Sequence, residues 1–94
     1  MLKIEVYGLK AGARNGPPVQ VTRGTIVLDD KTGKLKPVPS SKDATTLLNN
    51  MVADPIRTEA GQIIDPVDDP KSWINNAYQE YNGHRLWVSK PMEA

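Results

Sequence analysis

The sequence predicts a small α+β domain, in which an antiparallel or mixed sheet of about four to five strands carries two amphipathic helices on one face. Near the N-terminus, apolar and polar residues alternate with the period of two that is typical of a half-buried strand. Two later segments, 44–52 and 73–81, place apolar residues at helical spacing. Because strands and helices do not alternate regularly along the chain, a parallel sheet is disfavoured.

Length and composition indicate one domain, 1–94, with a modest core. The chain has no Phe, so the core must come from aliphatic residues, the two Trp and the three Tyr. It also has no Cys, which excludes a disulfide framework and a cysteine nucleophile. No segment matches a signal peptide or approaches the roughly 20 apolar residues of a membrane-spanning helix. We therefore expect a soluble cytoplasmic protein that is not inserted in a membrane.

The first half of the chain predicts most of the sheet. The alternation from Leu2 to Tyr7 is expected to end at Gly8, and the Gly- and Pro-rich residues 8–18 are expected to form a loop. Strand patterns resume at 19–28, with Gly24 as a bulge or tight turn. A polar hairpin turn at 29–34 should lead to a short edge strand at 35–38, since prolines 37 and 39 cannot donate to a ladder.

The first helix is expected to start near Ser40 and Ser41, whose side chains suit the free N–H groups of a first helical turn. It should end before Pro55, which disfavours helical backbone at the residue before it. Its apolar stripe consists of Ala44, Leu47, Leu48, Met51 and Val52. Residues 56–64 allow a small hairpin, and 65–68 form a turn.

The second helix is the strongest local prediction and spans Asp69 to Asn82. Asp69 is a favoured N-cap, Pro70 suits the first helical position, and Gly83 suits a left-handed residue after the end. Its apolar residues are Trp73, Ile74, Ala77, Tyr78 and Tyr81. A last strand should follow at 84–89, with Leu86 and Val88 on the side opposite Trp87, and 90–94 should be a tail.

Aromatic residues gather near the C-terminus, and they motivate our first functional hypothesis. We expect a non-enzymatic protein-interaction domain that binds a protein partner or a second copy of itself through the second helix and the last strand. Exposed aromatic residues beside an Arg are typical of interaction hot spots, although the same residues can serve as core. The proposed contact residues are Trp73, Tyr78, Tyr81, Arg85 and Trp87.

Charge is distributed unevenly, and this motivates the alternative hypothesis. Residues 1–42 contain eight basic and three acidic residues, whereas 43–94 contain four basic and eight acidic residues. The basic half can bind nucleic acid or another anion, or the two halves can simply attract each other within one fold. The anion-binding residues would be Lys10, Arg14, Arg23 and Lys34. The glycines at 8–16 do not form a recognised phosphate-binding motif.

An enzyme is the least favoured hypothesis, and we assign no catalytic residue, metal or cofactor. His84 is the only histidine, and a general base needs a partner that the sequence does not identify. Asp65, Asp68 and Asp69 could offer oxygen ligands to a cation, but their spacing does not match an EF-hand loop. Asp69 already has a role as a helix cap.

Overall fold

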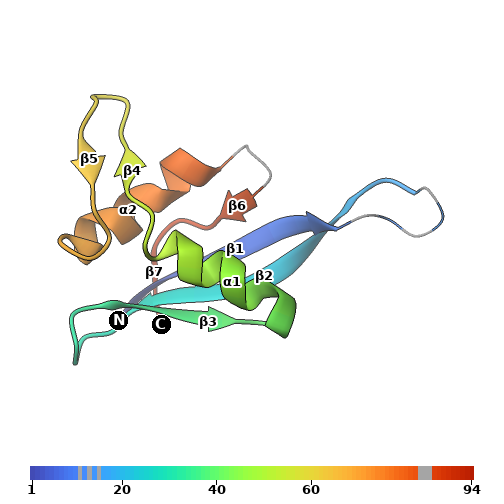
Figure 1. The fold of residues 1–94 in the computed structure, drawn as a ribbon, viewed down its shortest axis with the longest axis horizontal. Coiled ribbons are helices and arrows are strands. Elements are labelled where there is room, and N and C mark those ends of the chain that lie inside the picture. Colours follow the sequence, from blue (N-terminus) through green and yellow to red (C-terminus); the bar gives the residue numbers. More distant parts are fainter. Residues whose placement is uncertain (11, 13, 15, 83–85) are drawn as a thin grey trace.

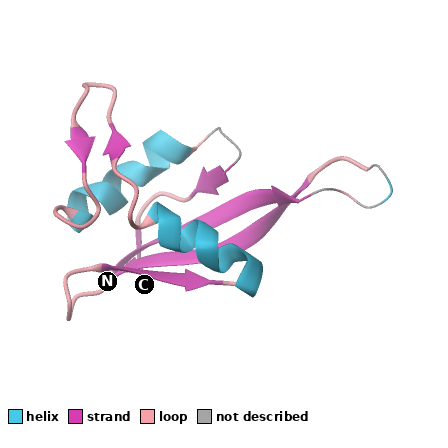
Figure 2. Cartoon of the chain, in the orientation of Figure 1, coloured by secondary structure: helices cyan, strands magenta, loops and turns pink. Residues whose placement is uncertain are grey.

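A computed structural model describes residues 1–94 apart from 11, 13, 15 and 83–85. It confirms the predicted α+β class: an antiparallel sheet of five strands carries two helices, and a separate two-stranded hairpin lies beside them (Figures 1 and 2). Strand order in the sheet is β3-β2-β1-β6, and β7 also pairs with β1. The elements are β1 (Leu2–Lys10), β2 (Val19–Leu28), β3 (Leu35–Pro39), α1 (Lys42–Met51), β4 (Ile56–Arg57), β5 (Ile63–Ile64), α2 (Pro70–Tyr81), β6 (Leu86–Val88) and β7 (Met92–Glu93).

The core lies between one face of the sheet and the two helices. Alternation along β1 turns Ile4 and Val6 to this face, and both are fully buried. Helix α1 packs over β2 and β3, whereas α2 packs chiefly over β6 and also contacts β1, β2 and β4. Each large buried aliphatic side chain contributes about 1.5–3 kcal/mol of hydrophobic stabilisation. The core residues are Ile4, Val6, Ile26, Leu48, Met51, Ile56, Ile64, Trp73, Ile74, Ala77 and Val88.

Helix α1 shows the predicted apolar stripe but not the predicted cap. Ala44, Leu48 and Met51 are buried. The Ser41 side chain makes no capping hydrogen bond, and its carbonyl instead accepts from the Ala44 N–H at 3.2 Å. The side-chain cap was therefore wrong, and α1 depends on its packing against the sheet.

Helix α2 begins as predicted. The Asp69 carboxylate accepts from the Ser72 N–H at 3.2 Å, and Pro70 is the first helical residue. Within α2, the indole Nε1 of Trp73 donates to the Asp54 carbonyl at 2.9 Å. This bond ties α2 to the segment that leaves α1. The predicted role of Gly83 lies outside the described residues.

The small hairpin within 56–64 is confirmed. Ile56 pairs with Ile64 in an antiparallel register, and both side chains are buried. The turn at 29–34 is also confirmed, because Asp29 donates to and accepts from residues across it. These two hairpins place apolar strand residues against the core and leave polar turns in water.

Two predictions about strand ends were wrong. Gly8 does not end β1, because it pairs with Val21 on one side and with Leu86 on the other. The residues expected to form a C-terminal tail include β7, in which Met92 lies opposite Lys3. In both cases backbone N–H and C=O groups find ladder partners that local sequence does not reveal.

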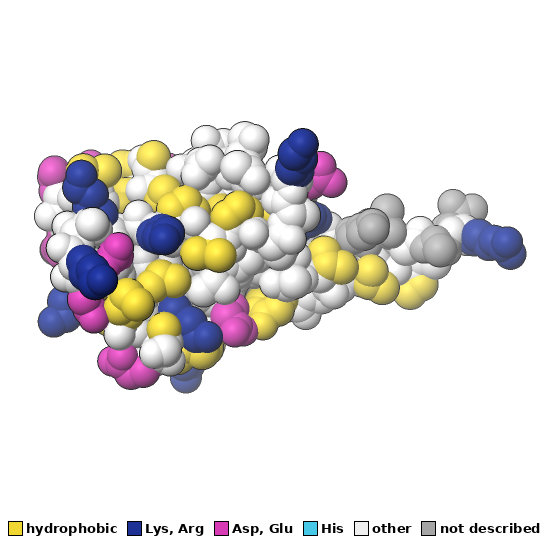
Figure 3. Space-filling model, turned by 90° about the horizontal axis from the view of Figure 1, so that it is seen from below, with side chains coloured by type: hydrophobic (Ala, Val, Ile, Leu, Met, Phe, Trp, Pro, Cys, Tyr) yellow, Lys and Arg dark blue, Asp and Glu magenta, His cyan; other side chains and the backbone are white. Residues whose placement is uncertain are grey.

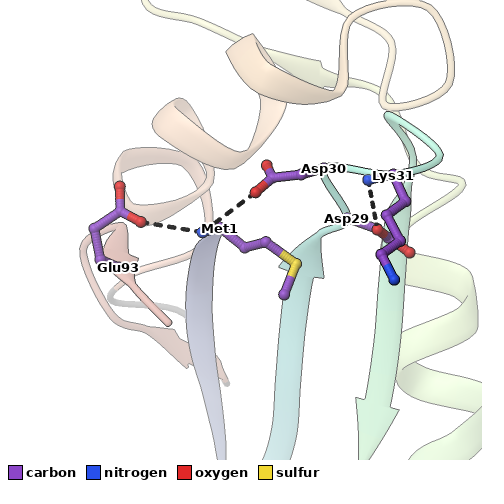
Figure 4. A network of polar contacts seen from close by, with 5 residues as sticks. All are labelled: Met1, Asp29, Asp30, Lys31 and Glu93. Atoms are coloured by element: carbon purple, nitrogen blue, oxygen red, sulfur yellow. Dashed lines mark hydrogen bonds and ion pairs between the residues drawn. The ribbon is translucent and has the colours of Figure 1, made fainter.

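Strands β6 and β7 pair with β1, and side-chain contacts add to this pairing. Between β6 and β7, the hydroxyl of Ser89 accepts from the Glu5 N–H at 2.9 Å, and the Ser89 N–H donates to the Glu5 carbonyl at 2.9 Å. The amino group of Met1 lies 3.1 Å from a Glu93 carboxylate oxygen and 3.6 Å from one of Asp30 (Figure 4). These contacts connect β7 and the β2–β3 turn to the start of β1.

Gly24 forms the predicted bulge. The β1–β2 register passes from Val6 opposite Gly24 to Tyr7 opposite Thr22, which leaves Arg23 without a partner in β1. Gly24 has a φ of +136°. A Cβ here would collide with the Val38 carbonyl oxygen and lie 2.7 Å from Leu48 Cδ1, so β3 and α1 approach each other over a residue that must lack a side chain.

We expect Gly24→Ala to lower the free energy of unfolding by roughly 2–5 kcal/mol, because it adds a backbone collision to an unfavourable φ. Gly61→Ala is the matched control. Gly61 also has a positive φ, +83°, but nothing lies within 4 Å of its Cβ position. Chemical denaturation of both variants would test this. Equal losses would show that φ alone, and not close packing, requires glycine at position 24.

Candidate functional site

The structure separates the aromatic residues that the sequence suggested as one surface. Trp73 is completely buried, so in this fold it is unable to contact a partner. Tyr81 lies against it with a ring separation of 6.2 Å and an interplanar angle of 61°. Tyr78 is half-buried, with the Lys90 ammonium 5.5 Å from its ring centre. Arg85 lies outside the described residues.

Trp87 lies on the opposite face of the sheet from the helices. It pairs with Tyr7, whereas its neighbours Leu86 and Val88 pair with Gly8 and Val6 on the helix-covered face. Trp87 is half-buried among its strand neighbours. The proposed contact residues therefore divide between the core, the end of α2 and the uncovered sheet face.

An open groove lies between α1 and the corner formed by the end of α2 and β6. It consists of two adjoining hollows, of about 310 and 440 Å³, and both Leu47 and Leu86 line each of them. The first hollow lies over Gly8 at the base of the β1–β2 ribbon, and the second reaches Tyr81. The remaining lining residues are Leu9, Arg23, Asp43, Ala44, Asn50, Met51, Ala53 and Asp54.

The bulge at Gly24 shapes the floor of this groove. Arg23, which the β1 register skips, lies over Gly8, where a Cβ would sit 2.9 Å from the guanidine Nε. The guanidinium also donates to the Leu9 carbonyl at 3.4 Å. Gly8 thus leaves room for a long cationic side chain to lie across the strand at one end of the groove.

At the other end of the groove, Asp54 anchors the aromatic wall. Its carboxylate accepts from the Tyr81 hydroxyl at 3.2 Å, while its carbonyl accepts from Trp73. Burial raises the pKa of the Tyr81 phenol far above its ordinary value, and the negative charge of Asp54 raises this pKa further. Tyr81 therefore stays neutral and presents a firmly held aromatic surface.

The residues of the predicted anion site divide between opposite ends of the long strands. Lys10 ends β1, Arg14 lies in the loop that joins β1 to β2, and Arg23 lies at the base of this ribbon. Lys34 belongs to the β2–β3 turn, where Asp29 accepts and donates backbone hydrogen bonds. Because β2 runs from Val19 to Leu28 between the two regions, Lys34 does not join the other cations.

The β1–β2 ribbon extends beyond the body of the molecule as an arm, which we define by its described residues 8–10, 12, 14 and 16–22 (Figure 1). Leu9 and Val19 on this arm are 43% and 49% exposed, and Gly16–Gln20 is exposed at every position. Figure 3 shows hydrophobic side chains along the arm and a basic one at its far end. No acidic residue occurs from Val6 to Leu28.

Two of the three acidic residues considered for metal binding, Asp65 and Asp69, have structural roles. Asp65 accepts from the N–H groups of Val67 and Asp68, and Asp69 caps α2. Within the described part of the chain, no group of three potential ligands is placed to hold a metal ion. His84 lies outside the described residues. None of the described helices is long and apolar enough to cross a membrane.

No family model, curated protein or solved structure matches the chain. The sequence predicted the cations of the arm, Lys10, Arg14 and Arg23, as an anion site, but it did not predict the groove. Leu47, at the margin of the α1 stripe, could have indicated the groove. When an apolar stripe is wider than the core needs, part of it remains available for other contacts.

Alkaline pH should destabilise the fold through Tyr81. Above about pH 10 the unfolded chain loses the Tyr81 proton while the folded chain keeps it, so stability falls as pH rises. We expect Tyr81→Phe to flatten the decrease in melting temperature above this pH. Tyr7, whose pKa is raised by its hydrogen bond to Glu5, adds its own loss of stability at alkaline pH in both proteins. Parallel curves for the two proteins would contradict the burial of this phenol.

Proposed function

We propose that this chain is a non-enzymatic protein-interaction domain, and that the groove between α1 and the α2–β6 corner accepts a segment of a protein partner. The observation that supports this most is the open groove lined by Leu47, Leu86 and Tyr81. The second helix and the last strand remain binding elements, and α1 joins them. Tyr81 stays a proposed contact residue, whereas Leu47 and Leu86 take the place of Trp73 and Trp87.

The groove has the chemistry of a peptide-binding site. Its centre is apolar, and charged groups stand at its ends: Arg23 and Asp43 at one end and Asp54 at the other. Apolar surface supplies affinity, while a few polar groups at the rim set orientation and specificity. Tyr81, held by its bond to Asp54, loses little conformational freedom on binding.

Selection from a random-peptide library on the immobilised protein would test the proposal. We expect enriched peptides whose binding is lost in Asn50→Arg, since Asn50 is exposed and lines the groove. Asn49→Arg is the matched control, because it places the same charge at an exposed neighbouring position of α1 that is not among the lining residues. Failure to enrich any peptide, or equal binding to both variants, would count against the groove.

A second candidate function is binding of nucleic acid or another polyanion by the arm. It is supported by the absence of acidic residues from Val6 to Leu28, within which Lys10, Arg14 and Arg23 occur. A two-stranded β-ribbon can enter the major groove of DNA, and cations that contact phosphates release counterions.

For this second candidate we expect measurable binding of labelled duplex or single-stranded nucleic acid at about 50 mM salt, with affinity that falls steeply as salt increases. Arg14→Asn should reduce both the affinity and the salt dependence, because Asn tolerates the positive φ of 51° at this position but carries no charge. Fluorescence anisotropy would measure both. An unchanged signal at low salt would exclude this function for the arm.

A further inference from the structure

We propose that the occupant of the groove is the arm of a second copy of this chain, with Gly16–Gln20 lying between α1 and the α2–β6 corner of its neighbour. This inference rests on the proposed function of the groove and names its partner. The chain would then self-associate through two different surfaces, each of which every copy carries.

The arm displays apolar surface that its own chain does not cover. Val19 is almost half exposed, and Pro17 and Pro18 are exposed beside it. The ribbon leads away from the body, so its far end is remote from the groove at its own base (Figures 1 and 3). A two-stranded ribbon is only marginally stable in water by itself, and contact with another molecule would cover its apolar side chains.

Arm and groove match in length and stiffness. The groove follows α1 from Asp43 to Met51, which is roughly 12 Å at the helical rise per residue, and continues past the helix end to Asp54. An extended segment of five residues, such as Gly16–Gln20, spans roughly 15 Å and is of comparable length. Because the ring of Pro fixes φ, Pro17 and Pro18 enter a groove with little further loss of backbone entropy. Apolar and aromatic walls formed by Leu47, Leu86 and Tyr81 suit such a segment.

The charges of the two surfaces are complementary. Among the described residues that line the groove, the carboxylates of Asp43 and Asp54 lie at its two ends, and Arg23 lies at the same end as Asp43. The arm brings Arg14 two residues before Gly16 and contains no acidic residue. When Gly16–Gln20 lies in the groove, Arg14 comes to one of its ends, where a carboxylate of the neighbour is available.

Sedimentation of matched variants tests the arm-in-groove contact. The arm variant combines Pro17→Ser, Pro18→Ser and Val19→Ser, all at exposed positions, and the groove variant is Asn50→Arg. Over about 10 µM to 1 mM, the range suited to a small interface, the unmodified chain should associate. Each variant alone should remain monomeric, and Asn49→Arg should associate like the unmodified chain. Circular dichroism should show that all of them fold.

Mixing the two variants gives the decisive result. The arm variant keeps an intact groove, and the groove variant keeps an intact arm, so an equimolar mixture should recover a heterodimer that neither protein forms alone. If association uses paired arms or the uncovered sheet face instead, the groove variant still self-associates and the inference is overturned.

Site-specific crosslinking supplies a second measurement. Because the chain has no Cys, Val19→Cys mixed with Asn50→Cys should form a disulfide-linked heterodimer under mild oxidation. Val19→Cys mixed with Asn49→Cys should form it at least several-fold more slowly. Equal rates would overturn the proposed register of arm and groove.

The outcomes also separate this inference from the proposed function. A chain that stays monomeric at all concentrations, yet binds selected peptides in a manner that Asn50→Arg abolishes, overturns self-association and leaves the groove as a site for another protein. A monomeric chain that binds nucleic acid, and loses this binding in the arm variant, assigns the arm to nucleic acid and also overturns the inference.

Discussion

The close approach of β2, β3 and α1 at Gly24 is the constraint on which most of the molecule depends. With no side chain at this position, the Val38 carbonyl and the Leu48 methyl group can both reach the backbone of β2. This contact seats α1 over β2 and β3, and it also introduces the bulge that removes Arg23 from the ladder. Bulges bend a strand and increase its twist, which fits the departure of the arm from the body just beyond this point (Figure 1).

Asp54 fixes the position of α2, as the close approach at Gly24 fixes that of α1. One residue accepts hydrogen bonds from both Trp73 and Tyr81, through its carbonyl and its carboxylate respectively. These bonds hold α2 against the segment that follows α1, although the two helices share only β2 among the strands they chiefly contact. The groove is the consequence: two helices fixed to separate parts of one sheet face leave apolar surface between them.

The two candidate surfaces have different physical origins. The groove consists of apolar residues that the helices only partly cover, whereas the arm consists of strand residues that extend past the last core contact. Both expose hydrophobic side chains in a chain that can bury only about 60–65% of its unfolded surface. A partner that covers both would add buried area that the chain by itself lacks, and such an association would therefore stabilise the fold.

Local sequence determined those features whose signals lie within a few residues. The Asp69–Pro70 helix start, the 29–34 turn, the 56–64 hairpin, both helical stripes and the opposite facing of Trp87 and Leu86 are examples. Each depends on capping, turn chemistry or periodicity, which are set by residues that lie close together in the sequence. Tertiary structure alone decided that Gly8 continues a strand, that Met92 pairs with Lys3, and that Trp73 is core while Leu47 lines a groove. The physical reason is that the strand partners and the exposure of a residue depend on segments that lie as many as about 90 residues away in the sequence. A local pattern shows that a residue is apolar, but it does not show which surface will cover that residue.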